Sequence, residues 1–273
     1  MKQLPTRAPL PARLPRVLPL LPLVLLAGAL GSGAAGAASL PETVAVVKKS
    51  VVGVGTFQRT RSPAIRFSGT GFVTGDGLSV ITNAHVVPDA LDPNAVETLG
   101  IVLGSGDSLE FRPATLAGRD REHDLAHLRL TGAALPALSL GEEAGMQEGR
   151  DIAFTGFPLA MTLGLHPATH RGVLAAITPI VMPSLNSHQL NPSAIVALQR
   201  SPFQIYQLDA TAYPGNSGSP VYDPATGVVY GIINMVFVKG LKETAITSPS
   251  GITYAVPARY ARELMQRKSL ESK

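Results

Sequence analysis

Residues 68–87 read SGTGFVTGDGLSVITNAHVV. Two runs rich in apolar and β-branched residues, Phe67–Thr74 and Leu78–Thr82, lie on either side of a Gly-Asp-Gly turn. Short runs of this kind, bounded by Gly and Asp, are typical of β-strands. His85 follows the second run, so the pattern places an imidazole at the end of an apolar strand. A histidine there is either a half-buried, hydrogen-bonded residue or a functional group.

The same pattern recurs on both sides of this stretch. The first set of expected strands covers Val51–Phe57, Phe67–Thr74, Leu78–Thr82, Thr98–Leu103, Leu109–Ala117 and Leu125–Leu130. The second set covers Asp151–Thr155, Gly172–Ile177, Phe203–Leu208, Ser219–Tyr222, Val228–Val236 and Gly251–Val256. Closing each set into a small barrel removes the exposed strand edges. We therefore predict an all-β fold of two packed six-stranded antiparallel β-barrels.

Two short helices are expected outside the barrels. Leu40–Lys49 has an acidic residue in its first turn, and Pro257–Lys268 has Pro at its start and apolar residues at helical spacing. The Gly-containing polar stretch Leu140–Arg150 separates the two strand sets. We expect the first barrel to occupy residues 39–140 and the second to occupy residues 141–273.

The first 38 residues resemble a secretory signal peptide. They start with basic residues, continue through the apolar run Val17–Leu30 and end in small residues before Ser39. A membrane-anchoring helix is the alternative, but a spanning helix needs roughly 20 apolar residues and this run contains prolines. We expect cleavage after Ala37 or Ala38, no stable membrane span after cleavage, and export to a bacterial periplasm or secretion.

Composition excludes several classes of function. The 273 residues include no Cys, which excludes disulfides, thiolate metal sites and a cysteine nucleophile. The net charge is +4, but four of the 23 basic residues lie in the first 38 residues, which contain no acid. The remaining 19 basic residues equal the 19 acidic ones. A basic surface for nucleic acid therefore has no support.

Residues 213–220, YPGNSGSP, place Ser217 in a glycine-rich turn before a strand. A hydroxyl is a weak nucleophile, so it needs a base within hydrogen-bond reach and N–H donors for the oxyanion that forms. Gly215 and Gly218 permit the tight backbone that such donors require. Turn statistics alone also allow a plain surface turn here.

Asp124 precedes the expected strand Leu125–Leu130, where it is either an exposed carboxylate or the partner that orients an imidazole. His123 and His127 flank it. This pair allows a metal-binding interpretation, but a structural site needs about four ligands and the sequence shows no further cluster.

Taken together, the segments SGTGFVTGDGLSVITNAHVV, HDLAHLRL, DATAYPGNSGSPVY, VVYGIIN and GITYAVPA resemble the trypsin-like serine protease superfamily. The similarity extends over roughly residues 44–260 and is strongest to the bacterial HtrA/DegP and glutamyl-endopeptidase-like branches. It implies an exported serine endopeptidase that works through an acyl-enzyme, with no metal or organic cofactor and with protein or peptide substrates.

The same resemblance assigns roles to individual residues. His85 would be the general base, Asp124 its orienting partner and Ser217 the nucleophile, with the site in the cleft between the barrels. The oxyanion hole would span Gly215, Asn216 and Ser217, with the N–H groups of Gly215 and Ser217 as donors. A binding or chaperone module that keeps the fold without catalysis is the alternative.

Substrate specificity is expected to depend on residues of the second barrel. Thr211, Ile233 and Tyr254 predict a pocket for a small or medium apolar side chain. The backbone from Ile232 through Asn234 to Met235 would bind an extended peptide as an added strand.

Two departures from the HtrA pattern follow. Only about sixteen residues lie beyond Pro257, so we expect no C-terminal PDZ domain. Thr178–Pro202 breaks the rhythm of strands for about 25 residues, and long loops in compact domains are usually functional. We expect this loop to gate the cleft or to bind a regulatory protein.

Overall fold

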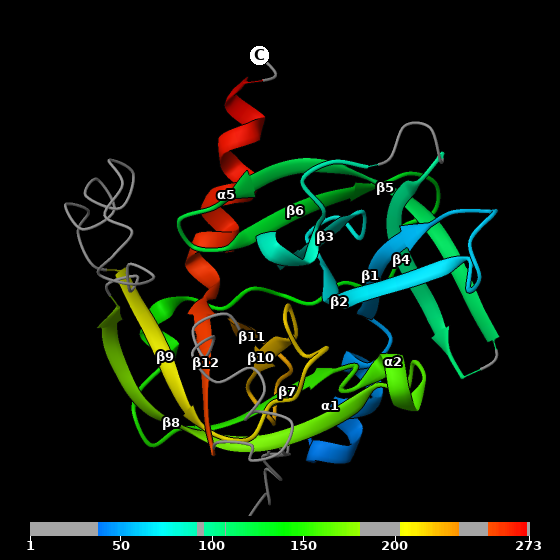
Figure 1. Cartoon of the computed structure of the whole chain (residues 1–273). Helices are drawn as coiled ribbons and strands as arrows, with labels where there is room; N and C mark the ends of the chain where they lie inside the picture. The colour runs from blue at the N-terminus through cyan, green and yellow to red at the C-terminus, as the bar shows by residue number, and fades with distance from the viewer. Residues whose placement is uncertain (1–37, 92–95, 107, 181–202, 235–250, 272–273) are drawn as a thin grey trace, which may run out of the picture. The chain divides into compact units, whose positions relative to one another are not determined.

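The computed structural model describes residues 38–91, 96–106, 108–180, 203–234 and 251–271. Its first barrel is closed in the strand order β1-β2-β3-β6-β5-β4 (Figure 1). The bounds are β1 Val51–Phe57, β2 Ile65–Thr74, β3 Ser79–Asn83, β4 Thr98–Ser105, β5 Ser108–Asp120 and β6 Leu125–Leu130. Each neighbouring pair is antiparallel, and pairing of β1 with β4 closes the barrel.

The second barrel is closed in the order β10-β11-β12-β9-β8-β7. Its bounds are β7 Asp151–Gly156, β8 Ala168–Ile180, β9 Phe203–Asp209, β10 Pro220–Tyr222, β11 Val229–Ile233 and β12 Ile252–Pro257. Pairing of β10 with β7 closes it. The prediction of two six-stranded antiparallel barrels is confirmed. The division of the chain at residue 140 stays a prediction.

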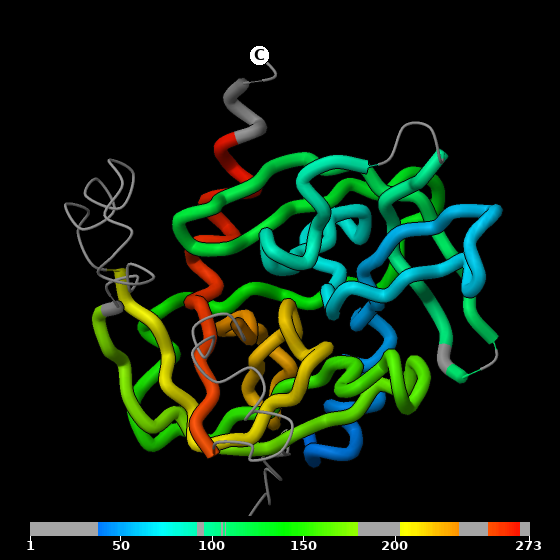
Figure 2. The backbone as a smooth tube through the Cα atoms, in the orientation of Figure 1, coloured from blue at the N-terminus to red at the C-terminus, as the bar shows by residue number. Residues whose placement is uncertain are grey.

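The helices at the two ends pack against opposite barrels. Helix α1, Leu40–Val47, lies against the turn of the second barrel, where Thr43 Oγ1 donates to Ala225 O at 3.4 Å. Helix α5, Ala258–Glu271, follows β12 but contacts β5 and β6 of the first barrel (Figures 1 and 2). Leu264 of α5 packs so closely on β5 that a Cβ at Gly118 would lie 3.1 Å from its Cδ1. Helix α1, which precedes the first barrel, therefore contacts the second barrel, and helix α5, which follows the second barrel, contacts the first.

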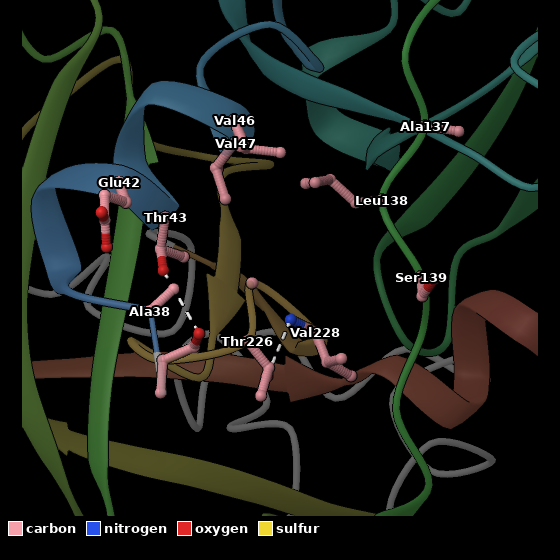
Figure 3. Close-up of a pocket in the computed structure, with 12 residues that line it drawn as sticks. Ala38, Glu42, Thr43, Val46, Val47, Ala137, Leu138, Ser139, Thr226 and Val228 are labelled. Atoms are coloured by element: carbon pink, nitrogen blue, oxygen red, sulfur yellow. Dashed lines mark hydrogen bonds between the residues drawn. The ribbon is translucent and has the colours of Figure 1, made fainter. Parts of the chain in front are cut away.

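Helix α1 also covers a hollow of about 270 Å³ between the connecting segment 137–139 and the turn at 225–228 (Figure 3). Glu42 helps to cap the N-terminus of this helix. Its carboxylate accepts hydrogen bonds from the backbone N–H and the hydroxyl of Ser39, each at 2.8 Å. This reciprocal cap is the capping box expected of Ser followed three residues later by Glu.

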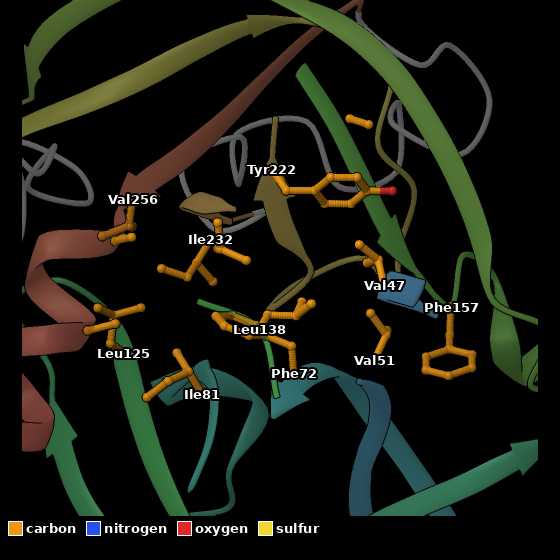
Figure 4. Packing of buried hydrophobic residues seen from close by; sticks show 14 of the residues in the cluster. Val47, Val51, Phe72, Ile81, Leu125, Leu138, Phe157, Tyr222, Ile232 and Val256 are labelled. Atoms are coloured by element: carbon orange, nitrogen blue, oxygen red, sulfur yellow. The ribbon is translucent and has the colours of Figure 1, made fainter. Parts of the chain in front are cut away.

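Three buried clusters form the core. One fills the first barrel and one fills the second. The third lies between them and joins Phe72 and Ile81 of the first barrel to Tyr222, Ile232 and Val256 of the second (Figure 4). All five are fully buried. The barrels thus share a continuous apolar interface, and burial of this surface stabilises their relative position.

Several local expectations were wrong. The strand expected at Gly172–Ile177 starts earlier, because β8 begins at Ala168, and His170 within it stacks on Phe154 with ring centroids 4.7 Å apart. The loop expected from Thr178 starts later, because β8 continues to Ile180 and pairs with Phe203. The remainder of Thr178–Pro202, residues 181–202, lies outside the described residues, as do Met235 and Val236 of the strand expected to end there. Helix α2, Ala160–Leu163, was not expected.

None of the helices in the described residues is both long and apolar enough to span a bilayer.

The β5–β6 ladder provides a matched test of core packing. Leu128 is fully buried, and its cross-strand partner Leu116 is 40% exposed. We expect Leu128→Ala to lower the free energy of unfolding by about 2–5 kcal/mol because it leaves a cavity. Leu116→Ala should cost roughly 1 kcal/mol or less. Urea denaturation measures both, and equal losses would contradict this assignment of the barrel interior.

His170 makes stability depend on pH. Burial lowers the pKa of this imidazole below its ordinary value of 6.5, so the folded state holds it neutral. As the pH falls, the unfolded chain takes up the proton first, and stability present above about pH 6.5 is lost as the pH approaches the native pKa. His170→Phe keeps the stacked ring and removes the titration. Unfolding free energies between roughly pH 7 and 5 should fall less steeply in the variant, and equal slopes would refute this role.

Candidate active site

The barrel topology brings His85 and Asp124 together. His85 lies in a 3₁₀ helix of one turn, Ala84–Val86, directly after β3, and Asp124 directly precedes β6. Strands β3 and β6 are hydrogen-bonded neighbours, with Asn83 opposite Leu125. Residues 39 positions apart in sequence are therefore adjacent at one end of the first barrel.

Asp124 holds His85 through several atoms. Its Oδ1 accepts the backbone N–H of His85 at 2.9 Å, and its Oδ2 lies 2.6 Å from the Nδ1 of His85. Its carbonyl oxygen accepts the backbone N–H of Ala84 at 3.0 Å. Asp124 has a φ of +53°, a left-handed conformation that Asp tolerates better than most residues. Both the main chain and the side chain of Asp124 therefore fix the orientation of the imidazole.

Ser217 reaches this pair from the second barrel. Its Oγ lies 3.0 Å from Nε2 of His85. Because a carboxylate only accepts hydrogen bonds, the Nδ1 facing Asp124 carries the hydrogen. In the neutral ring Nε2 is then the acceptor for the hydroxyl of Ser217. Ser217 is only 6% exposed, whereas the side chain of His85 is 29% exposed.

Two glycines permit the turn that carries Ser217. Gly215 has a φ of +102° and Gly218 a φ of +88°, a region that residues with a side chain avoid. A Cβ on Gly218 would lie 2.0 Å from the carbonyl oxygen of Thr70, and one on Gly215 would lie 2.2 Å from that of Phe157. The turn thus needs glycine for its conformation and for its close approach to neighbouring backbone.

Thr70 of β2 connects this turn to both barrels. Its backbone N–H donates to Ser217 O at 2.8 Å, and its hydroxyl donates to Gly215 O at 2.7 Å. The same hydroxyl accepts the N–H of Phe157, which directly follows β7, at 3.1 Å. Thr70 has no exposed surface. Its place between two glycines in SGTG was visible in the sequence, but its partners were not.

The peptide groups of the turn point in defined directions. The carbonyl of Pro214 accepts the N–H of Leu159 at 2.7 Å. Since the C=O and N–H of one peptide unit point in opposite directions, the N–H of Gly215 points away from Leu159. The N–H of Asn216 donates to Tyr213 O at 3.0 Å. Within the described residues, the amides of Gly215 and Ser217 donate no hydrogen bond. Of the three residues expected at the oxyanion hole, Asn216 therefore already donates its N–H within the turn, whereas the N–H groups of Gly215 and Ser217 have no acceptor there.

The expected substrate-binding residues divide into two groups. Ile232 and Ile233 are fully buried in the cores, so the expectation that Ile233 lines an open pocket is wrong. The N–H of Ile233 donates to Ser219 O and its carbonyl accepts the N–H of Gly218, so these groups are not available to a peptide. Thr211 and Tyr254 are half-buried and remain candidates.

Asn234 has a role that the sequence analysis missed. Its side-chain Nδ2 donates to Oδ2 of Asp124 at 3.0 Å, and its backbone N–H donates to Tyr254 O at 2.9 Å. This backbone N–H is therefore not available to a peptide, and the expectation that the backbone of Asn234 binds one stays a prediction for its carbonyl. Instead, the second barrel contributes a donor that holds the carboxylate facing His85. Asn234 ends the segment VVYGIIN, but nothing in that segment indicates that its side chain contacts Asp124.

His123 and His127 do not join a metal-binding cluster. The described residues contain no group of three or more His, Asp or Glu placed to hold a metal ion. His123 instead stacks on Tyr260 of α5 and lies 2.8 Å from Asp120 through Nδ1. Burial alone would raise the pKa of Asp120, but hydrogen bonds from His123 outweigh it and lower that pKa. This pair helps to anchor α5 on the first barrel.

Comparison with known families agrees with this geometry. A family model described as a trypsin-like peptidase domain matches residues 69–232, which is more than half of the chain. The chain belongs to this family. The match starts at Gly69, beside Thr70, and ends at Ile232 in β11, so it includes His85, Asp124 and Ser217.

Relatives of this trypsin-like domain are serine proteases of the HtrA type. The chain is 31% identical over 202 residues to mitochondrial serine protease HTRA2 of Bos taurus, which covers 73% of this chain and 36% of that protein. It is 28% identical over 199 residues to a probable periplasmic serine endoprotease, DegP-like, of Halomonas elongata, covering 73% of this chain and 34% of the relative. The chain thus spans about a third to two fifths of these curated relatives.

Solved structures agree on the fold. The HtrA-type protease AlgW with a decapeptide superposes with a TM-score of 0.59 at 24% identity, covering 84% of this chain and 67% of AlgW. AlgW with a tripeptide gives a TM-score of 0.55 at 25% identity, covering 84% and 62%. The trypsin-like two-barrel fold is therefore shared.

The contacts of Thr70 predict a large effect from a small change. Thr70→Val keeps the shape of the side chain but leaves the N–H of Phe157 and the carbonyl of Gly215 without their partner. We expect a loss of about 3 kcal/mol in the free energy of unfolding, because unpaired buried polar groups are costly. Thr115→Val, on the exposed face of β5, is the control and should cost roughly 0.5 kcal/mol or less. Equal effects in denaturant titrations would contradict the bridging role of Thr70.

Proposed function

We propose that this chain is an exported serine endopeptidase in which Ser217, His85 and Asp124 form the catalytic triad. The observation that carries the proposal is the continuous line of short contacts, 2.6 Å from Asp124 to His85 and 3.0 Å from His85 to Ser217. A domain at residues 39–140 supplies the base and its partner, and a domain at residues 141–273 supplies the nucleophile. Membership of the trypsin-like peptidase family supports this assignment.

In the proposed reaction, Ser217 Oγ attacks the carbonyl carbon of a peptide bond while Nε2 of His85 takes its proton. The oxyanion forms next to the N–H groups of Gly215 and Ser217, which donate to it. Asp124 stabilises the imidazolium and keeps its orientation. His85 then gives the proton to the departing amine, and water releases the acyl group by the same steps. Asn234 is a positioning residue that acts through Asp124.

Substrates of this site are proposed to be proteins or peptides in extended conformation. The acyl part of the substrate would lie on the side of Ser217 where β11 ends, next to Thr211 and Tyr254. The relatives are named as serine proteases, and AlgW was solved with peptides, which supports this substrate class.

Export is proposed from the leader pattern of residues 1–38. A relative from Halomonas elongata is named as periplasmic, which is consistent with removal of such a leader during export.

A fluorophosphonate probe tests the proposed chemistry. It should label the wild-type chain once, because an activated serine attacks phosphorus as it attacks a carbonyl carbon. Ser217→Ala should abolish labelling, and His85→Ala should slow it by a factor of about 10³ or more because the base is lost. Intact-mass spectrometry measures the adduct.

Asp151→Asn is the matched control, since Asp151 is an exposed carboxylate at the start of β7 that pairs with Arg171 at 2.9 Å. It should label like the wild type. An unlabelled wild-type chain, or one labelled equally after Ser217→Ala, would overturn the proposed triad and favour a binding module.

A further inference from the structure

His170 is a half-buried titratable side chain that the proposed reaction does not use. It lies on β8, directly opposite Phe154 of the neighbouring strand β7 (Figure 1). The two rings are stacked, with centroids 4.7 Å apart and planes 13° from parallel. Phe154 is fully buried in the core of the second barrel. One face of the imidazole is therefore closed off by an apolar ring.

The ring of Tyr213 also lies against His170. Their centroids are 6.2 Å apart, within the range in which aromatic rings attract each other. Tyr213 is the first residue of the turn that carries Ser217, and its carbonyl oxygen accepts the N–H of Asn216 at 3.0 Å. The amides on either side of Asn216 are the proposed donors to the oxyanion. The imidazole thus contacts the residue that fixes the start of this turn.

The segment that follows β7 holds the next two residues of the same turn. The N–H of Leu159 donates to Pro214 O at 2.7 Å. A Cβ on Gly215 would lie 2.2 Å from Phe157 O. Three consecutive residues of the turn therefore rest on β7, β8 and the segment between them. In the described part of the chain, the ring contact with Tyr213 is the one of these three that involves a titratable group.

The surroundings of His170 do not favour a positive charge. Its Nε2 is buried and has no hydrogen-bond partner in the described part of the chain. Burial lowers the pKa of this imidazole. Protonation gives both ring nitrogens a hydrogen, and the hydrogen on Nε2 would have no acceptor. Because a buried charge without a partner is costly, the protonated ring is expected to leave its place beside Phe154 for water.

Neighbouring titratable groups do not compensate this charge. They are Asp151 on β7, Arg171 on β8, Tyr206 and Asp209 on β9, Tyr213 in the turn and Tyr222 on β10. Asp151 and Arg171 are exposed and pair with each other at 2.9 Å. Asp209 is exposed at the end of β9. Burial raises the pKa of Tyr222, and that of Tyr206 to about 12, so both phenols stay neutral.

We propose that His170 is a positioning residue for the turn that carries Ser217, and that protonation of its ring releases Tyr213 and slows the reaction. The proposal rests on the proposed protease function. It adds to that function a second proton that must be absent, besides the one that His85 takes up. The chain would then react only when both imidazoles are neutral.

The pH dependence of fluorophosphonate labelling tests this role. The rate constant is measured between roughly pH 8 and 4.5, and each profile is divided by its own value at the upper end. The logarithm of the wild-type rate should approach a slope of about 2 per pH unit at the acid end, because two protons interfere. His170→Phe keeps a ring that cannot take up a proton and should give a slope of about 1. Equal slopes would overturn the proposal.

The size of the effect follows from the titration of one group. One pH unit below the pKa of His170, the normalised wild-type rate should be about tenfold lower than that of His170→Phe. His166→Phe is the matched control, because His166 is an exposed histidine four residues earlier in the chain. Its profile should keep the wild-type slope. A slope lowered equally by His166→Phe would contradict a specific role for His170.

Removing the ring separates its support of the turn from its titration. His170→Ala should label about threefold to tenfold more slowly than His170→Phe even at the upper end of the pH range, since it loses the aromatic contact with Tyr213. Equal rates of the Ala and Phe variants there would show that the turn does not need this contact, which would overturn the positioning role.

Nuclear magnetic resonance measures the coupling without relying on activity. Labelled His and Tyr side chains are followed against pH in the Ser217→Ala variant, with His170→Phe and Tyr213→Phe added to assign the signals. The ring signal of Tyr213 should shift with the same midpoint as His170 while the chain stays folded, and it should stay constant when His170→Phe is present. A Tyr213 signal that ignores this titration, or an imidazole that titrates only as the chain unfolds, would overturn the proposal.

Failure of this inference and failure of the protease function give different results. Labelling of the wild-type chain with the same slope as His170→Phe overturns the role of His170 alone. No labelling at any pH overturns the triad, and with it any effect of His170 on the reaction. The resonance titration then decides whether His170 still supports Tyr213.

Discussion

The hydrogen bonds of Thr70 are the constraint on which the rest of the site depends. His85 and Asp124 belong to one barrel and Ser217 to the other, so a shift of 1 Å between barrels would break the 3.0 Å contact between imidazole and hydroxyl. Thr70 prevents this shift because its backbone and hydroxyl hold the Ser217 turn on β2. The buried apolar cluster between the barrels excludes water from these hydrogen bonds.

Two of the three non-glycine residues with a positive φ in the described part of the chain lie at the proposed site. Asp124 and Leu159 have φ values of +53° and +51°, and Gly215 and Gly218 are also left-handed. Each of the two non-glycine residues is held by its contacts: Asp124 by His85 and Asn234, and Leu159 by its hydrogen bond to Pro214. Strain of this kind persists only where the surrounding structure fixes it, and the three packed cores provide that support.

Much of the fold could be predicted because its signals are local. Runs such as Val51–Phe57 and Leu125–Leu130 matched strands to the residue, since a short apolar run bounded by turn residues is a property of the segment itself. Prediction failed where distant contacts decide. His170 is in a strand because β7 pairs with its segment, and Ile233 is in the core because its side chain packs into the buried cluster inside the second barrel. Neither partner can be read from neighbouring residues.

The sequence by itself predicted the two sets of strands and their closure into barrels, because residue type and short-range spacing carry that information, and its resemblance to trypsin-like proteases implied the residues expected to react. Only the tertiary structure decided that Asn234 holds Asp124 and that Thr70 joins the turn to both barrels. These contacts join residues 87 to 145 positions apart that belong to different barrels. Their physical cause is the closure and packing of the barrels, which brings such residues into contact and buries the polar bonds between them.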